Sequence, residues 1–210
     1  MYLHGIADNR MSATGIIERF EKHGLDVVAY DSRAHGESGG EVCTYGFHEK
    51  KDLSRVLDAM PPGPIILVGT SLGAAVALQA AAEDTRITGV VAAEVFSDLV
   101  TVVRERAPFV FTPGLIRRAM DLAQERGRFQ FDAVSPVVAA RKVNVPVLLI
   151  HGAEDIDTSP EHSRRVFAAL PGNKRLMIVE GARHNESLRS EVWVEIESWV
   201  ETALAATPVP

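Results

Sequence analysis

The chain has 210 residues, of which 46% are apolar and 24% are charged, a composition that excludes disorder over most of its length. No run of residues approaches 18 uninterrupted apolar positions, and the lone cysteine, Cys43, excludes an internal disulfide framework and a cysteine-based zinc site. The net charge of −6 argues against a general nucleic-acid-binding protein, so we expect no nucleic acid among its partners.

Short apolar, β-rich runs alternate with helical patterns along the chain. Most of the runs are nearly continuously apolar, which is typical of strands covered on both faces of a parallel sheet. The candidate strands are residues 2–3, 26–30, 65–68, 88–95, 145–150 and 175–179. The candidate helices are residues 12–23, 47–60, 72–83, 159–170 and 188–206. This alternation predicts an α/β fold with a mainly parallel sheet flanked by helices.

The segment 96–142 interrupts the alternation, because it contains no clear strand. Its prolines separate two helical pieces, residues 99–106 and 114–126. An insertion between two strands of an α/β sheet commonly lies over the C-terminal edge of the sheet, where ligands bind in such folds. We therefore expect a single domain over residues 1–210 that carries a short helical cap at about residues 96–142.

A candidate nucleophile lies in the sequence Gly69-Thr70-Ser71-Leu72-Gly73. The pattern G-x-S-x-G is weak alone, but here it follows an apolar strand and opens an alanine-rich helix, which is the context of a nucleophile elbow. A serine in such a tight turn adopts a strained backbone, and the positions two before and two after it crowd together, so both need glycine. A phosphate-binding loop would need G-K-[ST] instead. The pattern thus predicts that Ser71 is a nucleophile.

A serine hydroxyl needs a base, and the histidines that follow Ser71 are His151, His162 and His184. His151 ends a strand, and His162 lies in a helical pattern among charged neighbours, which indicates a solvated side chain. His184 lies in a loop after a strand and before the last helix. Because the base of such folds follows a strand and comes last in the order serine, acid, histidine, the placement favours His184.

The acid that orients the histidine should lie between Ser71 and His184. The strand 145–150 leads into His151-Gly152-Ala153-Glu154-Asp155-Ile156-Asp157, and Asp155 is the first choice. Such an acid accepts the Nδ1–H of the histidine and stabilises the imidazolium. Three other carboxylates remain alternatives: Asp157, Glu154 and Asp98.

Four motifs resemble those of a known family. They are H-G-I-A-D-N at 4–9, D-S-R-A-H-G-E-S at 31–38, G-T-S-L-G at 69–73, and H-G-A-E-D at 151–155 followed by His184. On these motifs the whole chain resembles the serine hydrolases of the α/β-hydrolase superfamily, especially the lysophospholipase-like and serine-aminopeptidase-like esterases. The second motif departs from the family at Ala34, where glycine is common.

The resemblance implies a role for each matching residue. It implies Ser71 as nucleophile, Asp155 as acid and His184 as base, with the backbone N–H groups of Ile6 and Leu72 as the oxyanion hole. It also implies that His35 braces its loop, and that the segment 96–142 is a lid that shapes substrate choice. Phe109 and Phe111 of that lid are candidates for lining an acyl pocket. The family chemistry needs no metal and no organic cofactor.

These observations predict a serine hydrolase that cleaves a small-molecule carboxylic ester through an acyl-enzyme. A thioesterase or an amide or peptide hydrolase would use the same residues. An alternative of another class is an N-terminally truncated or non-catalytic protein of the hydrolase fold. This alternative rests on the opening Met1-Tyr2-Leu3, which supplies at most three residues for the family's third strand, while two earlier strands have no counterpart.

From that opening we expect a chain with further upstream residues to be more soluble and more stable, because it would cover an exposed sheet edge. The lack of a visible signal peptide and the single cysteine predict a cytoplasmic protein. The sequence predicts nothing about the oligomeric state.

Overall fold

The structure, a computed structural model, describes residues 1–205. Its centre is a five-stranded sheet in the order β1-β2-β3-β4-β5, with every neighbouring pair parallel. The strands are β1 (Tyr2–Leu3), β2 (Ile65–Thr70), β3 (Ile87–Ala93), β4 (Val147–Gly152) and β5 (Lys174–Val179). The predicted α/β fold with a parallel sheet is therefore confirmed, and each of these strands overlaps a predicted one.

The predicted strand at 26–30 is wrong. Within it, only Ala29 forms an isolated bridge, to Tyr2, supported by a hydrogen bond of 2.8 Å from the Tyr2 N–H to the Val28 carbonyl oxygen. The reason is the length of the neighbour: β1 has two residues, so it offers the segment almost no ladder to extend.

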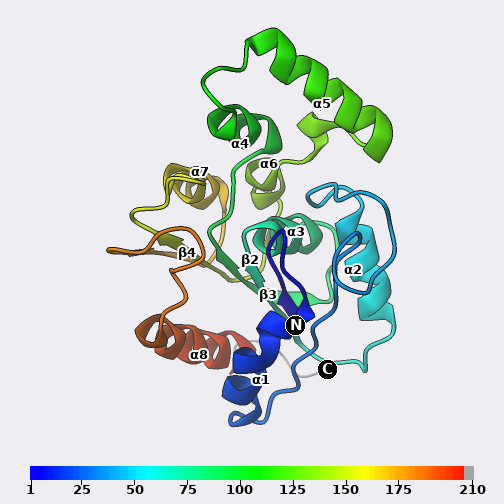
Figure 1. Ribbon diagram of the computed structural model, residues 1–210. Coiled ribbons are helices and arrows are strands. Elements are labelled where there is room, and N and C mark those ends of the chain that lie inside the picture. The colour runs from blue at the N-terminus through cyan, green and yellow to red at the C-terminus, as the bar shows by residue number, and fades with distance from the viewer. Residues whose placement is uncertain (206–210) are drawn as a thin grey trace.

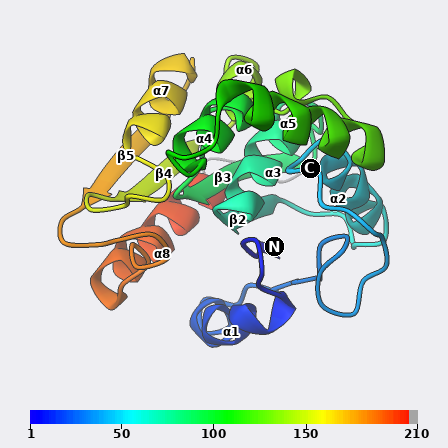
Figure 2. The same cartoon turned by 45° about the horizontal axis from the view of Figure 1, so that its top comes forward.

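Helices cover both faces of the sheet (Figures 1 and 2). On one face lie α1 (Thr14–Glu21), which packs through Ile16 and Phe20, and α8 (Ser190–Ala205), which packs through Trp193 and Ile196. The other face is covered by α2 (Glu49–Asp58), α3 (Leu72–Ala81) and α7 (Glu161–Ala169). A short 3₁₀ turn, η1 (Arg10–Ala13), precedes α1, so the predicted helix 12–23 is divided in two, and residue 206 of the last predicted helix lies outside the described residues.

The segment between β3 and β4 forms the predicted helical excursion. It contains α4 (Leu99–Arg106), α5 (Pro113–Gly127), the 3₁₀ turn η2 (Phe131–Ala133) and α6 (Pro136–Ala140). The first two match the predicted pieces, and α6, which Ser135 caps through the Val138 N–H, was not predicted. Figure 1 shows α5 projecting from the body of the molecule. Within residues 1–205, no helix combines the length and apolar character that a bilayer crossing requires.

The buried strands explain the continuous apolar runs of the sequence. In β4, Val147 and Leu149 pack into the core on one face of the sheet, and Leu148 and Ile150 pack into the core on the other face. Successive side chains of a strand point to opposite faces, so a strand with two covered faces is apolar at every position.

A Leu149→Ala substitution is expected to destabilise the protein by about 3 kcal/mol, because Leu149 is fully buried and its truncation leaves a cavity. Urea denaturation measures the free energy of unfolding. Leu115→Ala in α5 is the matched control, since Leu115 is 50% exposed and should cost well under 1 kcal/mol. Equal losses in the two variants would contradict the assignment of the core.

Candidate active site

Ser71 lies in a sharp turn between β2 and α3. Its backbone has φ 48° and ψ −106°, which is rare for a residue with a side chain, and its N–H donates to the Ala93 carbonyl oxygen at 2.8 Å. The flanking glycines fit the predicted crowding in different ways. A Cβ on Gly69 would lie 2.4 Å from the backbone of Gly73, whereas a Cβ on Gly73 would lie 2.1 Å from the Leu3 carbonyl oxygen.

The structure brings Ser71, His184 and Asp155 together at the C-terminal ends of three strands. The Ser71 Oγ lies 3.2 Å from the His184 Nε2, and the His184 Nδ1 lies 2.6 Å from the Asp155 Oδ2. Asp155 follows β4 and His184 follows β5. With the Nδ1–H donated to a carboxylate, the Nε2 is left free to accept the Ser71 hydroxyl proton.

Buried contacts hold the Asp155 carboxylate in place. Its Oδ1 accepts the backbone N–H groups of Asp157 and Thr158 at 3.0 and 2.8 Å, and its Oδ2 lies 3.2 Å from the His151 Nε2. Burial alone would raise the pKa of the Asp155 carboxyl, but its hydrogen bonds with His151, His184 and the Thr158 N–H, together with the charge of His184, outweigh burial and hold the pKa well below its usual range.

The pKa of His184 is shifted in the opposite direction. Burial lowers the pKa of the imidazole, but the hydrogen bond to Asp155 and the negative charges of Asp155 and Glu94 outweigh burial, so this pKa is raised above its ordinary value. The positive charge of Arg106 opposes that rise. The imidazole is therefore stabilised as the cation that proton uptake from Ser71 would create.

The two pKa shifts predict a pH window for the stability that Asp155 supplies. Because folding lowers the pKa of the Asp155 carboxyl, the carboxylate stabilises the fold above about pH 4. Because folding raises the pKa of His184, the imidazolium stabilises the fold below about pH 6.5. The melting temperature of Asp155→Asn should thus fall furthest below that of the wild type near pH 5, and the gap should narrow at pH 8 and at pH 3. Glu154→Gln, an exposed carboxylate one position earlier, is the control, and a gap that does not change with pH would contradict the prediction.

The other predicted acids do not reach His184. Glu154 and Asp157 are exposed, and Asp98 caps α4 by accepting the Thr101 N–H at 2.8 Å. The prediction that His162 is solvated is wrong. The side chain is fully buried, its Nδ1 accepts the Ser97 N–H at 3.0 Å, and its Nε2 lies 2.7 Å from a Glu105 carboxylate oxygen.

A buried carboxylate that was not predicted from the sequence lies beside His184. Glu94 directly follows β3, and one of its carboxylate oxygens lies 3.7 Å from the His184 Nδ1. The predicted strand 88–95 included this position, whereas β3 ends one residue before it. Among the described residues, Glu94, Asp155 and His184 have ligand atoms within 4.8 Å of one another, as a cation site would need. We assign no metal to them, because His184 and Asp155 already share a hydrogen bond.

The turn that follows β1 lies against Ser71. A Cβ on Gly5 would lie 3.8 Å from the Ser71 Cβ, at an ordinary contact distance. Buried His4 fixes this turn, since its Nδ1–H donates to the Gly5 carbonyl oxygen at 2.7 Å and its Nε2 accepts the Ser32 N–H at 2.9 Å. His35 packs edge-on against the His4 ring and lies within hydrogen-bond distance of the Arg33 carbonyl oxygen, in keeping with a bracing role.

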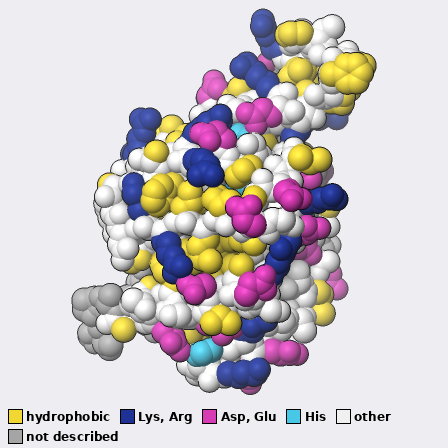
Figure 3. Space-filling view, turned by 90° about the vertical axis from the view of Figure 1, so that its left-hand side faces the viewer, with side chains coloured by type: hydrophobic (Ala, Val, Ile, Leu, Met, Phe, Trp, Pro, Cys, Tyr) yellow, Lys and Arg dark blue, Asp and Glu magenta, His cyan; other side chains and the backbone are white. Residues whose placement is uncertain are grey.

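An apolar hollow of about 380 Å³ lies between α4 and α5. Phe111 lines it together with Leu99, Val102 and Ile116. Among the described residues, Arg106 is the one charged side chain in its wall. Phe109 is not part of this wall and is 100% exposed. Figure 3 shows hydrophobic side chains exposed at the top of the molecule, the end from which α5 projects in Figure 1.

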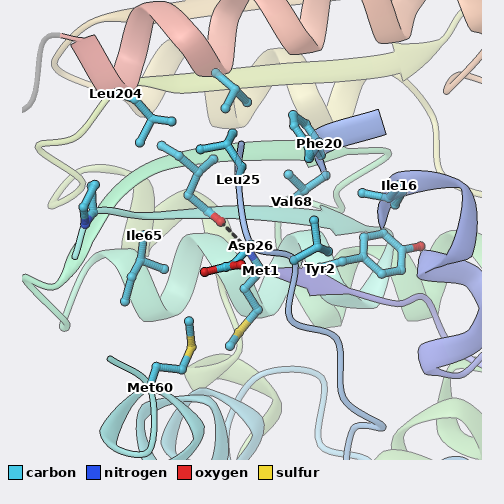
Figure 4. Close-up of a pocket in the computed structure, with 14 residues that line it drawn as sticks. Met1, Tyr2, Ile16, Phe20, Leu25, Asp26, Met60, Ile65, Val68 and Leu204 are labelled. Carbon is cyan, nitrogen blue, oxygen red and sulfur yellow. Dashed lines mark hydrogen bonds between the residues drawn. The ribbon is translucent and has the colours of Figure 1, made fainter. Parts of the chain in front are cut away.

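A second apolar hollow, of about 90 Å³, lies at the opposite end of the strands from Ser71 (Figure 4). Its wall includes Ile65, the first residue of β2, and Phe20 and Leu204 from the helices on one face of the sheet. Ser71 follows the last residue of β2, so this hollow is not part of the candidate active site.

Two family models match the chain. One, described as the alpha/beta hydrolase fold, matches residues 1–112, and the other, described as the prolyl oligopeptidase family, matches residues 58–206. The chain belongs to the α/β-hydrolase superfamily.

This α/β-hydrolase is 30% identical over 192 residues to the uncharacterized protein YqkD of Bacillus subtilis (strain 168), a match that covers 86% of the chain. The chain spans 63% and 59% of the lengths of the first two curated relatives it matches. The Pyrococcus furiosus esterase Pf2001 matches with a TM-score of 0.76 and 25% identity over 97% of the chain and 80% of the esterase. The Paleococcus ferrophilus monoacylglycerol lipase matches in fold, with a TM-score of 0.74 and 22% identity over 98% of the chain and 93% of the lipase.

Proposed function

We propose that this α/β-hydrolase is a serine hydrolase that cleaves carboxylic esters through an acyl-enzyme. The observation that carries the proposal is the unbroken chain of contacts from the Ser71 Oγ through the His184 imidazole to the Asp155 carboxylate. Ser71 attacks the ester carbonyl while His184 takes its proton and then returns it to the leaving alcohol. Water then attacks the acyl-enzyme with His184 as base, and Asp155 keeps the imidazole oriented throughout.

The oxyanion of each tetrahedral intermediate is assigned to two backbone N–H groups, those of Leu72 and Ile6. Leu72 is the first residue of α3, where amide groups have no partner within the helix and the helix dipole is positive. Ile6 lies in the turn that packs against Ser71. Every step uses a group of the chain itself, so the proposed reaction needs no metal and no organic cofactor.

An ester with an apolar acyl group is the proposed substrate. Three relatives support it by their names: the Pf2001 esterase, the Paleococcus ferrophilus monoacylglycerol lipase, and a monoglyceride lipase homolog of Monkeypox virus that is 22% identical over 94% of the chain. The hollow lined by Phe111 supplies apolar surface for an acyl chain. The exposed position of Phe109 gives it no part in that wall.

Hydrolysis of an amide or peptide bond is the second candidate function. It is favoured by the prolyl oligopeptidase family model, whose match over residues 58–206 includes Ser71, Asp155 and His184. The same residues serve both reactions, so a panel of esters, thioesters and aminoacyl amides with matched acyl groups separates them.

A fluorophosphonate probe tests the proposed chemistry directly. The probe traps only an activated serine, so we expect one covalent adduct per chain, placed on Ser71 by mass spectrometry of its peptide. Boiled protein is the control for unspecific labelling. An unlabelled folded protein, or an adduct on another serine, would overturn the proposal and favour a non-catalytic member of the fold.

A further inference from the structure

Glu94 is a buried carboxylate that the reaction described above does not use. It follows the last residue of β3, is 1% exposed, and has φ 57°, in the left-handed region that residues with side chains seldom adopt. A buried charged group on an unfavourable backbone persists only where its surroundings hold it. The contacts of its two oxygens show what holds it.

Both carboxylate oxygens of Glu94 bind the loop that carries His184. The Oε2 accepts the Asn185 N–H at 2.6 Å, and the Oε1 accepts the Ser187 N–H at 3.2 Å. These two backbone groups lie one and three positions after His184 in the chain. The carboxylate therefore ties the loop after β5 to the end of β3, two strands away in the sheet.

The same carboxylate places negative charge beside the imidazole. The Glu94 Oε2 lies 3.7 Å from the His184 Nδ1, on which the Asp155 Oδ2 lies at 2.6 Å. The charged groups that act on His184 come from three places: Glu94 after β3, Asp155 after β4, and Arg106 at the end of α4. Two anions and one cation thus surround a base that becomes a cation during the proposed reaction.

We propose, on the basis of the serine hydrolase function proposed above, that Glu94 is a positioning residue for His184. Its carboxylate fixes the loop that presents the base to Ser71, and its charge stabilises the imidazolium together with that of Asp155. The first role needs a hydrogen-bond acceptor and the second needs a negative charge. Two conservative substitutions separate these roles.

Glu94→Gln keeps one of the two acceptor oxygens, puts an amide NH2 in place of the other, and removes the charge. The loss of a negative charge at 3.7 Å lowers the pKa of His184, so the acid limb of the kcat profile should move to lower pH by about one unit. Glu94→Asp keeps the charge but is one methylene too short to reach both amides. Its acid limb should stay near that of the wild type, while its kcat falls by about tenfold through a less well-placed base.

Glu154→Gln is the matched control, because it removes an exposed carboxylate next to Asp155, and its kcat profile should equal that of the wild type. A residue with a purely structural role would lower kcat or stability in Glu94→Gln without moving the acid limb. An unmoved limb in folded Glu94→Gln would therefore overturn the proposed electrostatic role. A folded Glu94→Asp with the kcat of the wild type would overturn the proposed loop anchoring.

Hydrogen exchange of the wild-type protein tests the anchor even where a Glu94 variant does not fold. The amides of Asn185 and Ser187 should exchange slowly for a surface loop, since each donates to a buried carboxylate. Exchange at the rate of an unstructured peptide would overturn the anchor. The fluorophosphonate probe separates the two proposals: a labelled enzyme with an unmoved acid limb fails only the inference on Glu94, and an unlabelled wild type fails the proposed function itself.

Discussion

A Ser71→Ala substitution is expected to lower the turnover of a p-nitrophenyl ester by about 10⁴- to 10⁶-fold. The reason is that the Ser71 hydroxyl is the proposed nucleophile of the acyl-enzyme, with its oxygen 3.2 Å from the His184 Nε2. The residual rate would come from substrate binding and the proposed oxyanion donors, which the substitution leaves in place. The steady-state absorbance of the released p-nitrophenolate, at about 400 nm, measures the loss of turnover.

Ser97→Ala is the control for this substitution, because Ser97 is one of the other described serines whose hydroxyl contacts a histidine. The Ser97 Oγ lies 2.8 Å from the His162 Nδ1, but Ser97 is fully buried and does not occupy the turn between β2 and α3. It should keep both ester hydrolysis and fluorophosphonate labelling. Activity that survives Ser71→Ala and disappears in Ser97→Ala would contradict the assignment of Ser71 as nucleophile and favour Ser97.

The fold could be predicted to the extent that burial shapes the sequence. Strands with two covered faces are apolar at every position, so β2, β3 and β4 stand out without any alignment. The segment 26–30 shows the limit of that signal. It has the composition of a strand, but a strand also needs a neighbour of sufficient length, and the sequence of a segment does not contain its pairing partner.

The candidate site could be predicted where chain order and loop placement apply. Ser71, Asp155 and His184 follow the ends of separate strands, and the fold gathers those ends at one edge of a parallel sheet. His162 was misread from its charged neighbours. Its position on α7 carried the correct signal, since His162, Val166 and Leu170 recur at intervals of four and all are buried.

The proposed role of Glu94 could not be predicted from the sequence, for a different reason. Its function depends on two backbone amides that lie 91 and 93 positions away in the chain, and no local pattern encodes their approach. The exposure of Phe109 has a related origin. An apolar aromatic residue in a cap segment suggests the wall of a pocket. Whether it faces the pocket or the solvent depends on how α4 and α5 pack, which the local sequence does not specify.

A Gly73→Ala substitution is expected to combine a large loss of stability with a loss of activity in the molecules that still fold. The new Cβ would lie 2.1 Å from the Leu3 carbonyl oxygen and 2.8 Å from that of His4, and neither backbone atom can rotate away. Relief requires β1 to move from α3, at a cost of about 3 kcal/mol. In a chain of this size that corresponds to a fall of about 10 °C in the melting temperature.

The displacement of β1 is also expected to lower activity, because β1 continues directly into the turn that contains Ile6. Moving that turn withdraws one of the two proposed oxyanion donors, which lowers kcat by about 100-fold with little change in KM. Gly15→Ala in α1 is the matched control. A Cβ there meets nothing within 4 Å, so it should be neutral or stabilise the helix by up to about 1 kcal/mol. A folded Gly73→Ala with full activity would show that the turn after β1 does not supply an oxyanion donor, and would leave Leu72 as the donor that the geometry still supports.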